Sequence, residues 1–324
     1  MKKILHLIFG RFFVVAMAII LQVLWLCVVL WQLSYKFTYV NLLVRVIAII
    51  VVLVIVNKWT NPANKLSWTF LILLSPIFGL MVYFLFGRSG LTKHTRERMD
   101  AVNRQVEALF QRDSAVEKGL EKESRSAYLQ SSYIDKWAGF PLYQNTQTKY
   151  YSCGEEMFPD MLEALRGAKH FIFLEYFIIE EGYMFNTILD ILEEKAKAGV
   201  DVRFIYDDVG SINSISFGYY KKLQERGIPC VTFNPFKPLI SVVMNNRDHR
   251  KIFVVDGYIG FTGGINLADE YINKVKRFGY WKDTGVRIEG EAVWSLTAMF
   301  LEMWNYINRS TEDYSRFLPS VYKI

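Results

Sequence analysis

The sequence is poor in the residues that build disulfides, metal sites and histidine-based catalytic centres. Its 324 residues include three cysteines and four histidines. The cysteines have none of the spacings typical of a zinc site or a redox pair, so we expect reduced structural thiols at Cys27, Cys153 and Cys230. No cluster of histidine, cysteine and aspartate has the spacing of metal ligands. The sequence therefore predicts no metal and no cofactor.

The four histidines differ in their neighbours, and one of them has neighbours suited to phosphate chemistry. His249 is followed two residues later by Lys251 and seven residues later by Asp256, and no other histidine has either partner at that spacing. Alternate residues of a strand share a face, so His249 and Lys251 are predicted to meet one phosphate together. The imidazole supplies a nucleophile, and the ammonium stabilises phosphate oxygens. The pattern occurs once in the chain.

Hydrophobic residues make up 52% of the chain, and their excess lies almost entirely in the first ninety residues. Residues 12–31 contain one polar residue, and such a run crosses ~30 Å of hydrocarbon as a helix. Basic residues precede it and no small-residue cleavage site follows it, which predicts a retained signal-anchor. Residues 42–56, interrupted by one arginine, predict a second span.

A third apolar run, residues 68–86, carries Pro76 and Gly79 near its middle. It predicts either a kinked span or a re-entrant hairpin whose backbone is buried in protein. Basic residues flank the apolar region on both sides, at Lys2, Lys3, Arg11, Arg88, Lys93, Arg96 and Arg98. Because basic flanks stay on the cytoplasmic side, we expect a multi-pass protein of the cell membrane with its catalytic domain in the cytoplasm.

The net charge of +6 and the isoelectric point near 9.0 suit an anionic membrane or a nucleic acid, and the apolar runs favour the membrane. We divide the chain into a membrane region with two or three hydrophobic segments (1–87), a charged helical linker (88–145) and a catalytic half-domain (146–324). The loop at residues 233–240 mixes prolines, aromatics and a lysine. It is either a substrate entrance at the lipid interface or an ordinary proline-stiffened loop.

Short apolar runs alternate with amphipathic helical patterns from residue 150 onward. The runs predict strands at residues 171–179, 202–206, 230–233, 252–255 and 286–288. The helical patterns lie between them, at residues 157–165, 185–198, 217–226 and 292–307. Mostly apolar strands separated by helices predict an α/β domain with a mostly parallel sheet flanked by helices.

The segment "NNRDHRKIFVVDGYIGFTGGINLADEY" contains H-x-K-x4-D followed by G-G-x-N, the signature of the phospholipase D superfamily. Its flanks resemble bacterial cardiolipin synthases, and "NPANKLSWTFLILLSPIFGLMVYFLFGR" resembles the membrane segment before their catalytic region. Members of this kind use two motif copies, so the resemblance covers the membrane region and the first catalytic half. It implies a phospholipase D-like domain, with His249 as nucleophile and Lys251 as phosphate ligand.

The resemblance also implies roles for residues around the motif. Asn266 matches the family position that donates to phosphate oxygens, and Gly264 allows close backbone approach. Asp256 is grouped with the catalytic residues by the motif, and we assign it an organising role as a strand-to-turn aspartate. Asp283 is expected to accept the Nδ1 hydrogen of His249 and so fix its tautomer.

Two acidic residues on or after predicted strands are assigned to substrate binding. Glu175 lies on an apolar strand, where a carboxylate is costly unless it is paired. Asp208 lies in the segment Asp207-Asp208-Val209-Gly210-Ser211, where a strand ends. This segment resembles the family's D-x-x-G-S turn, although ordinary turn chemistry explains it equally well. A scattered basic surface surrounds the motif, at Arg247, Arg250, Lys274, Lys276 and Arg277.

The sequence thus predicts a membrane phosphatidyltransferase that converts two phosphatidylglycerol molecules into cardiolipin and glycerol through a phosphatidyl-histidine. The single motif predicts a fragment or truncated form, or a half that pairs with a second half from the same or another chain, as in a homodimer. Two alternatives remain: a membrane-anchored phospholipase D that uses water, and a non-catalytic half-synthase that binds lipid or a partner chain. A nuclease is disfavoured by the apolar runs, and no nucleic acid partner is expected.

Overall fold

The computed structural model describes residues 20–25, 28–29, 38–87, 93–235, 246–319 and 321. The chain divides into two compact units, Met1–Gly90 and Leu91–Ile324. Of the predicted span at residues 12–31, the structure describes residues 20–25 and 28–29, which are helical, and most of the loop at 233–240 lies outside the described residues. The three-part division at residues 87 and 145 stays a prediction.

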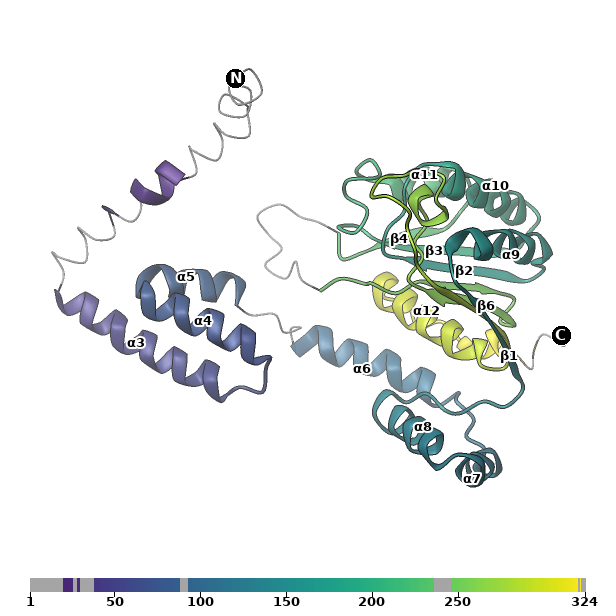
Figure 1. Ribbon diagram of the computed structural model, residues 1–324, viewed down its shortest axis with the longest axis horizontal. Helices are drawn as coiled ribbons and strands as arrows, with labels where there is room; N and C mark the ends of the chain where they lie inside the picture. The colour runs from purple at the N-terminus through teal and green to yellow at the C-terminus, as the bar shows by residue number, and fades with distance from the viewer. Residues whose placement is uncertain are drawn as a thin grey trace, which may run out of the picture. The chain divides into compact units, whose positions relative to one another are not determined.

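Within the described residues 38–87, the first unit contains three helices, α3 (Thr38–Asn57), α4 (Pro62–Leu74) and α5 (Pro76–Phe86) (Figure 1). The side chain of Asn61 accepts a hydrogen bond from the amide of Ala63 and so caps α4, with Pro62 in the first turn. Ser75 ends α4, and α5 begins directly after it. A Cβ on Gly79 would lie 2.6 Å from the Cα of Ile72, so α4 and α5 form a tight helical hairpin.

The helical hairpin changes the expectation for the third apolar run. The run is broken at Ser75 into helices of 13 and 11 residues, each too short to cross ~30 Å of hydrocarbon by itself. In the part of the chain that the structure describes, one helix, Tyr39–Asn57, has the length and composition to cross a membrane. This helix contains the predicted second span.

The second unit is built on a seven-stranded mixed sheet in the order β1-β7-β6-β5-β2-β3-β4. The strands are β1 (Thr146–Tyr151), β2 (Phe171–Tyr176), β3 (Asp201–Asp207), β4 (Cys230–Phe233), β5 (Ile252–Val255), β6 (Ile259–Gly263) and β7 (Gly285–Gly290). Only the β2–β3 and β3–β4 pairs are parallel, and the other four are antiparallel. The prediction of a mostly parallel sheet was wrong, because a three-residue turn between β5 and β6 joins strands that run in opposite directions.

Helices cover both faces of the sheet, as predicted (Figure 1). On one face, α9 (Gly154–Gly167), α10 (Tyr183–Lys197) and α11 (Tyr219–Glu225) pack on Ile172, Leu174, Val202, Phe204, Phe253 and Val255. On the other face, α12 (Val293–Asn308) packs on Phe171, Phe173, Ile205, Ile252 and Val254. Successive strand residues point to opposite faces, so each strand contributes to both cores.

Three further helices precede the sheet: α6 (Lys93–Glu107), α7 (Ser114–Glu123) and α8 (Arg125–Ala138). The end of α6 is not solvated, because Val106 is fully buried in the cluster around α12 and Phe110 contacts Trp294 edge to face. By contrast, α7 and α8 contain no buried residue.

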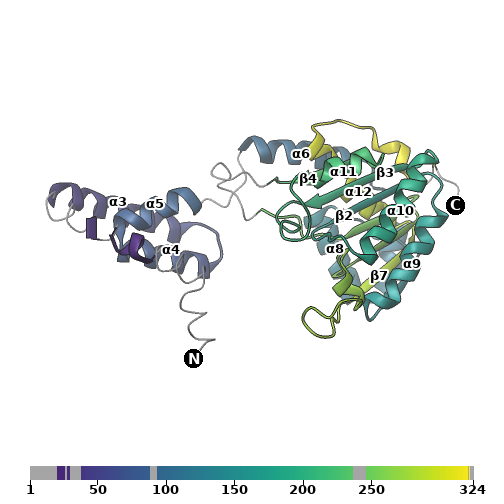
Figure 2. The same ribbon diagram turned by 90° about the horizontal axis from the view of Figure 1, so that it is seen from above.

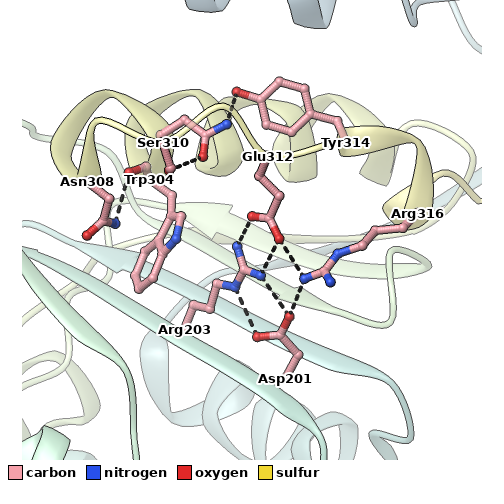
Figure 3. A network of polar contacts seen from close by, with 9 residues as sticks. Asp201, Arg203, Trp304, Asn308, Ser310, Glu312, Tyr314 and Arg316 are labelled. Carbon is pink, nitrogen blue, oxygen red and sulfur yellow. Dashed lines mark hydrogen bonds and ion pairs between the residues drawn. The ribbon is translucent and has the colours of Figure 1, made fainter.

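The segment after α12 is tied to β3 by a charged cluster (Figure 3). Arg203 donates to the carboxylates of Asp201 and Glu312, and Arg316 joins both acids from the short 3-10 helix η2 (Tyr314–Phe317). The Arg203 guanidinium also lies over the ring of Trp304 at 5.3 Å. These ion pairs hold the segment after α12 against β3.

Candidate active site

The candidate site lies at one end of the sheet, where β2 and β3 end and β5 begins. In the antiparallel β2–β5 pair, Glu175 is opposite Ile252, so the residues that follow β2 lie beside those that precede β5. Asp207, the last residue of β3, accepts a hydrogen bond from the amide of Asp248 at 2.9 Å. That bond fixes the chain immediately before His249.

His249 and Lys251 are brought together here, although both precede β5, which begins at Ile252. The ammonium Nζ of Lys251 donates to the carbonyl oxygen of His249 at 2.8 Å and lies 3.5 Å from its ring Nδ1. His249 is exposed, whereas Lys251 is 4% exposed. The nucleophile candidate is therefore open to a substrate, and the cation beneath it is held in one position.

The burial of Lys251 changes its acidity. Burial lowers the pKa of its ammonium from 10.5 to about 8, against the opposing effect of the carboxylates of Asp283 and Asp248. A weakly hydrated ammonium interacts strongly with a phosphate oxygen, because less water must be displaced when the anion arrives. The backbone oxygen of Lys251 accepts from the Thr262 hydroxyl at 2.8 Å, which links β5 to β6.

Phe177, which the sequence does not single out, forms one wall of the site. Its ring lies 4.6 Å from the His249 ring between centroids and 5.3 Å from the Lys251 Nζ. The backbone of Gly210 packs directly against Phe177, since a Cβ at position 210 would lie 2.2 Å from the Phe177 carbonyl oxygen. The sequence contains no signal for this role, since Phe177 is one of several aromatic residues in an apolar run.

Asn266 is buried beside the site and holds two segments together. Its Oδ1 accepts from the amide of Ile178 at 3.0 Å, and its Nδ2 donates to the Tyr271 hydroxyl at 2.8 Å. An amide nitrogen carries two hydrogens, so one remains for a phosphate oxygen. The predicted donation to substrate is compatible with this geometry and stays a prediction.

The predicted Asp283–His249 pair is not formed between these two described residues. The Oδ1 of Asp283 accepts from the amide of Thr284 at 2.8 Å, and the ring Nδ1 of His249 faces Lys251 instead. Asp283 stands over Gly264, where a Cβ would lie 2.0 Å from its Oδ1. Gly264 thus makes room for this carboxylate, which raises the pKa of Lys251 rather than orienting the histidine.

Asp256 lies at the opposite end of β5 from His249. Its carboxylate accepts from the backbone amides of Lys169, His170 and Phe171 at 2.8, 2.7 and 2.9 Å. It therefore caps the start of β2, which agrees with an organising role and not with direct participation in catalysis.

Glu175 does not line this site. It is fully buried, and its partner on β5 is Ile252, which points toward α12, whereas Lys251 points the other way. Its Oε1 forms an ion pair with Arg250 Nη2 at 2.7 Å. Burial raises the pKa of Glu175 well above its usual range, and Arg250 opposes that effect. The predicted substrate contact is replaced by a buried ion pair, because the strand alternation separates Glu175 from the phosphate face.

Of the two aspartates that follow one another at the end of β3, Asp207 is the fully buried one. Its Oδ1 accepts from the amide of Gly210 at 2.8 Å, which forms the turn predicted here, and Arg247 Nη1 lies 3.4 Å away. Asp208 is half-buried, and its proposed contact with substrate stays a prediction. Across the described ranges there is no group of three residues suited to hold a metal ion.

Two families match this chain. Residues 161–304 match the family described as "Cardiolipin synthase, PLD-like domain", and residues 46–88 match "Phospholipase_D-nuclease N-terminal". "Cardiolipin synthase 1" of Bacillus anthracis is 35% identical over 286 residues, which cover 86% of this chain and 55% of that protein. An "Uncharacterized protein" of Streptococcus mutans is 41% identical over 261 residues, covering 81% of this chain and 57% of that protein.

The chain therefore spans little more than half the length of these curated relatives. Among solved structures, the phospholipase D family member Nuc from Salmonella typhimurium is 22% identical and covers 52% of this chain and 97% of that chain, at a TM-score of 0.36. The family matches and the curated relatives confirm the resemblance to bacterial cardiolipin synthases that the motif indicates.

Proposed function

We propose that this chain, whose residues 161–304 belong to the family of cardiolipin synthase, PLD-like domains, is one catalytic half of a membrane phosphatidyltransferase. The observation that carries the proposal is the exposed ring of His249 above the buried ammonium of Lys251, 3.5 Å from its Nδ1. This pair offers a nucleophile and a fixed cation to the same phosphodiester.

In the proposed first step, a ring nitrogen of His249 attacks the phosphorus of one phosphatidylglycerol. A phosphorus–nitrogen bond forms, the phosphorus–oxygen bond to glycerol breaks, and the glycerol oxygen takes a proton. Lys251 and the remaining Asn266 hydrogen stabilise the phosphate oxygens as charge redistributes. In the second step, the primary hydroxyl of another phosphatidylglycerol attacks, loses its proton to a base and releases the histidine.

Both steps need a general acid and base in addition to the nucleophile. His249 is the only residue of this chain with the motif's neighbours, so we assign that role to a second catalytic half, from a further segment or another copy of the chain. The same half is a suitable source of the carboxylate that fixes the His249 tautomer, since no hydrogen bond joins Asp283 to His249 among the described residues.

The membrane assignment follows from the sequence together with α3. We propose a multi-pass protein of the cell membrane, in which the apolar run of residues 12–31 is one span, α3 is a second span and the α4–α5 hairpin is re-entrant, because neither of its helices reaches across alone. Basic residues on both sides of the apolar region support a cytoplasmic location for the catalytic unit.

The test is cardiolipin formation by the full chain, purified in detergent and supplied with phosphatidylglycerol, compared with His249→Ala. Product is expected from the intact chain, alone or with a second half added in trans, and none from the variant. Release of phosphatidic acid without cardiolipin would favour the hydrolase, because water would then be the acceptor. Normal lipid binding without any product, with or without a second half, would overturn the enzyme in favour of a non-catalytic half-synthase.

A further inference from the structure

The segment between η1 (Asp269–Ile272) and β7 forms a protruding loop, Lys274 to Lys282, at the site end of the sheet (Figure 2, yellow-green, beside the label of β7). Its sequence, KVKRFGYWK, contains four basic residues and no acidic one. Apolar side chains at its tip are exposed to an unusual degree: Val275 by 50%, Phe278 by 72% and Tyr280 by 65%. A cluster of exposed apolar side chains marks an interaction surface.

The base of this loop is rigid although its tip is exposed. The side chain of Asn273 accepts from the amide of Trp281 at 2.6 Å and donates to the Trp281 carbonyl oxygen at 2.9 Å. Trp281 packs edge to face on Tyr271, the residue that holds Asn266. The loop is therefore braced against the candidate active site and projects from it in a fixed direction.

This loop contacts the segment that follows β2 through two of its basic side chains. Arg277 forms an ion pair with Glu180 at 3.3 Å, and Lys274 lies 4.5 Å from the centre of the Tyr183 ring. The Asp269 carboxylate accepts from the amides of Tyr183 and Met184. These contacts place a further exposed aromatic ring, that of Tyr183, next to the loop.

The loop after β3 is fastened to the same segment. Ser211 Oγ accepts from the amide of Ile179 at 3.1 Å, and Ser214 Oγ donates to the Ile179 carbonyl oxygen at 2.8 Å. This loop exposes Ile212 by 47% and Phe217 by 93%. The end of the sheet that carries His249 is thus rimmed by exposed apolar side chains from three connected segments.

We propose that residues 274–282 dock on an anionic lipid surface and insert Val275, Phe278 and Tyr280 into its interfacial layer. Aromatic side chains flanked by lysine favour the boundary between headgroups and acyl chains, and each basic residue near an anionic surface strengthens association. Docking would bring the open face of His249 to phospholipid headgroups. The proposal rests on the lipid-directed function above and adds the surface through which the substrate is reached.

Charge complementarity favours a lipid over the other possible occupants. A nucleic acid would leave the exposed Val275 and Phe278 without apolar partners, whereas a bilayer interface accommodates both the apolar tip and its lysines. The competing apolar surface in this unit lies on α8, where Leu129, Tyr133 and Trp137 are exposed at successive turns. The loop contacts the candidate site through Trp281 and Tyr271, whereas none of the contacts described above joins α8 to the site. The loop is therefore the better placed of the two surfaces to bring lipid to His249.

The test uses the full chain in nanodiscs, with Cys27, Cys153 and Cys230 replaced and a single Phe278→Cys labelled with an environment-sensitive fluorophore. Lipids that carry a quencher in the acyl chain should quench this label in discs containing phosphatidylglycerol, and much less in discs of phosphatidylcholine alone. A label at Tyr150→Cys, an exposed position on β1, is the matched control and should show no such dependence.

Variants that remove one positive charge measure the electrostatic contribution of the loop's lysines to docking. Lys276→Gln and Lys282→Gln should each reduce the ratio of docked to undocked loop about fivefold. Lys118→Gln and Lys122→Gln, on two exposed lysines of α7, should leave the ratio unchanged. Adding inorganic phosphate to phosphatidylcholine discs should not cause quenching, which separates a lipid headgroup from a free anion.

Three outcomes would overturn the proposal: no phosphatidylglycerol dependence of the Phe278→Cys label, quenching at Trp137→Cys in its place, or a response to oligonucleotide but not to lipid. Turnover is measured on the same discs. Product without quenching would overturn the docking proposal and leave the proposed enzyme standing. Quenching without any phospholipid turnover would support the docking proposal and overturn the proposed enzyme.

Discussion

The ammonium of Lys251 lies between the carbonyl oxygen of His249, at 2.8 Å, and the ring Nδ1 of the same residue, at 3.5 Å. Lys251 is thus fixed by the backbone of the residue that it assists. An ammonium carries three hydrogens, so donor capacity remains for a phosphate oxygen. Burial of this cation under an exposed imidazole makes the pair sensitive to pH.

Turnover should decline on the alkaline side with an apparent pKa near 8, because Lys251 in the empty site loses its proton there rather than at 10.5. Lys251→Arg keeps its charge and should move this decline to higher pH. The measurement is kcat/KM for phosphatidylglycerol as a function of pH. Lys118→Met, which removes an exposed lysine of α7, should leave the profile unchanged; the same decline in Lys251→Arg would disprove the assignment.

The folded chain should also become more stable between pH 8 and 10.5. In this window the unfolded chain retains the Lys251 proton that the folded chain has released, so stability rises with pH. Lys251→Met should lack this gain, measured by thermal unfolding in detergent. A rise of equal size in the variant would show that another group causes it.

Asp256→Asn should lower the free energy of unfolding by about 1–3 kcal/mol, because the charge and one acceptor for the amides of residues 169–171 are lost. Asparagine tolerates the positive φ of 52° at this position, so backbone strain adds little. His249→Ala should change stability by less than about 0.5 kcal/mol while abolishing turnover. An Asp256→Asn protein with full stability and no activity would instead place Asp256 in the reaction.

Glu302→Gln should reduce the pH dependence of stability around neutrality. Burial raises the pKa of Glu302 to about 7, against the effect of Arg250. Between pH 4.5 and 7 the folded chain holds a proton that the unfolded chain has lost, so stability decreases as pH rises through this window. The variant should avoid this loss, on the order of 1 kcal/mol, in urea unfolding at pH 5 and pH 8. Glu121→Gln, on the exposed surface of α7, is the matched control.

The charged cluster of Figure 3 allows a comparison between a buried and an exposed arginine. Arg203→Met leaves Asp201 and Glu312 without their shared partner and should cost about 3 kcal/mol or more. Arg316→Gln, at a side chain that is 52% exposed, should cost less than about 1 kcal/mol. Urea unfolding of both variants measures the difference, and equal losses would show that burial of Arg203 is not the cause.

Much of the local structure could be predicted from the sequence, because it depends on neighbours along the chain. The apolar run of β2 and the amphipathic pattern of α10 predicted their elements, and Pro76 predicted the break in the third apolar run. The direction of β5 could not be predicted in the same way. It depends on the antiparallel pairing of β5 with β2, a strand far away in the sequence, and the apolar pattern did not indicate β6, the strand on its other side.

The motif determined by itself that the side chains of His249 and Lys251 can meet, because residues two apart along the chain stay within reach of each other. It also indicated the lipid-directed chemistry, through the apolar runs and the family signature that accompany it. Only the tertiary structure decided which acidic residues belong to the site. Glu175 pairs with Arg250 on the opposite face, and the Asp283 carboxylate opposes the lowering of the Lys251 pKa, because side-chain partners are chosen by packing between segments far apart in the sequence.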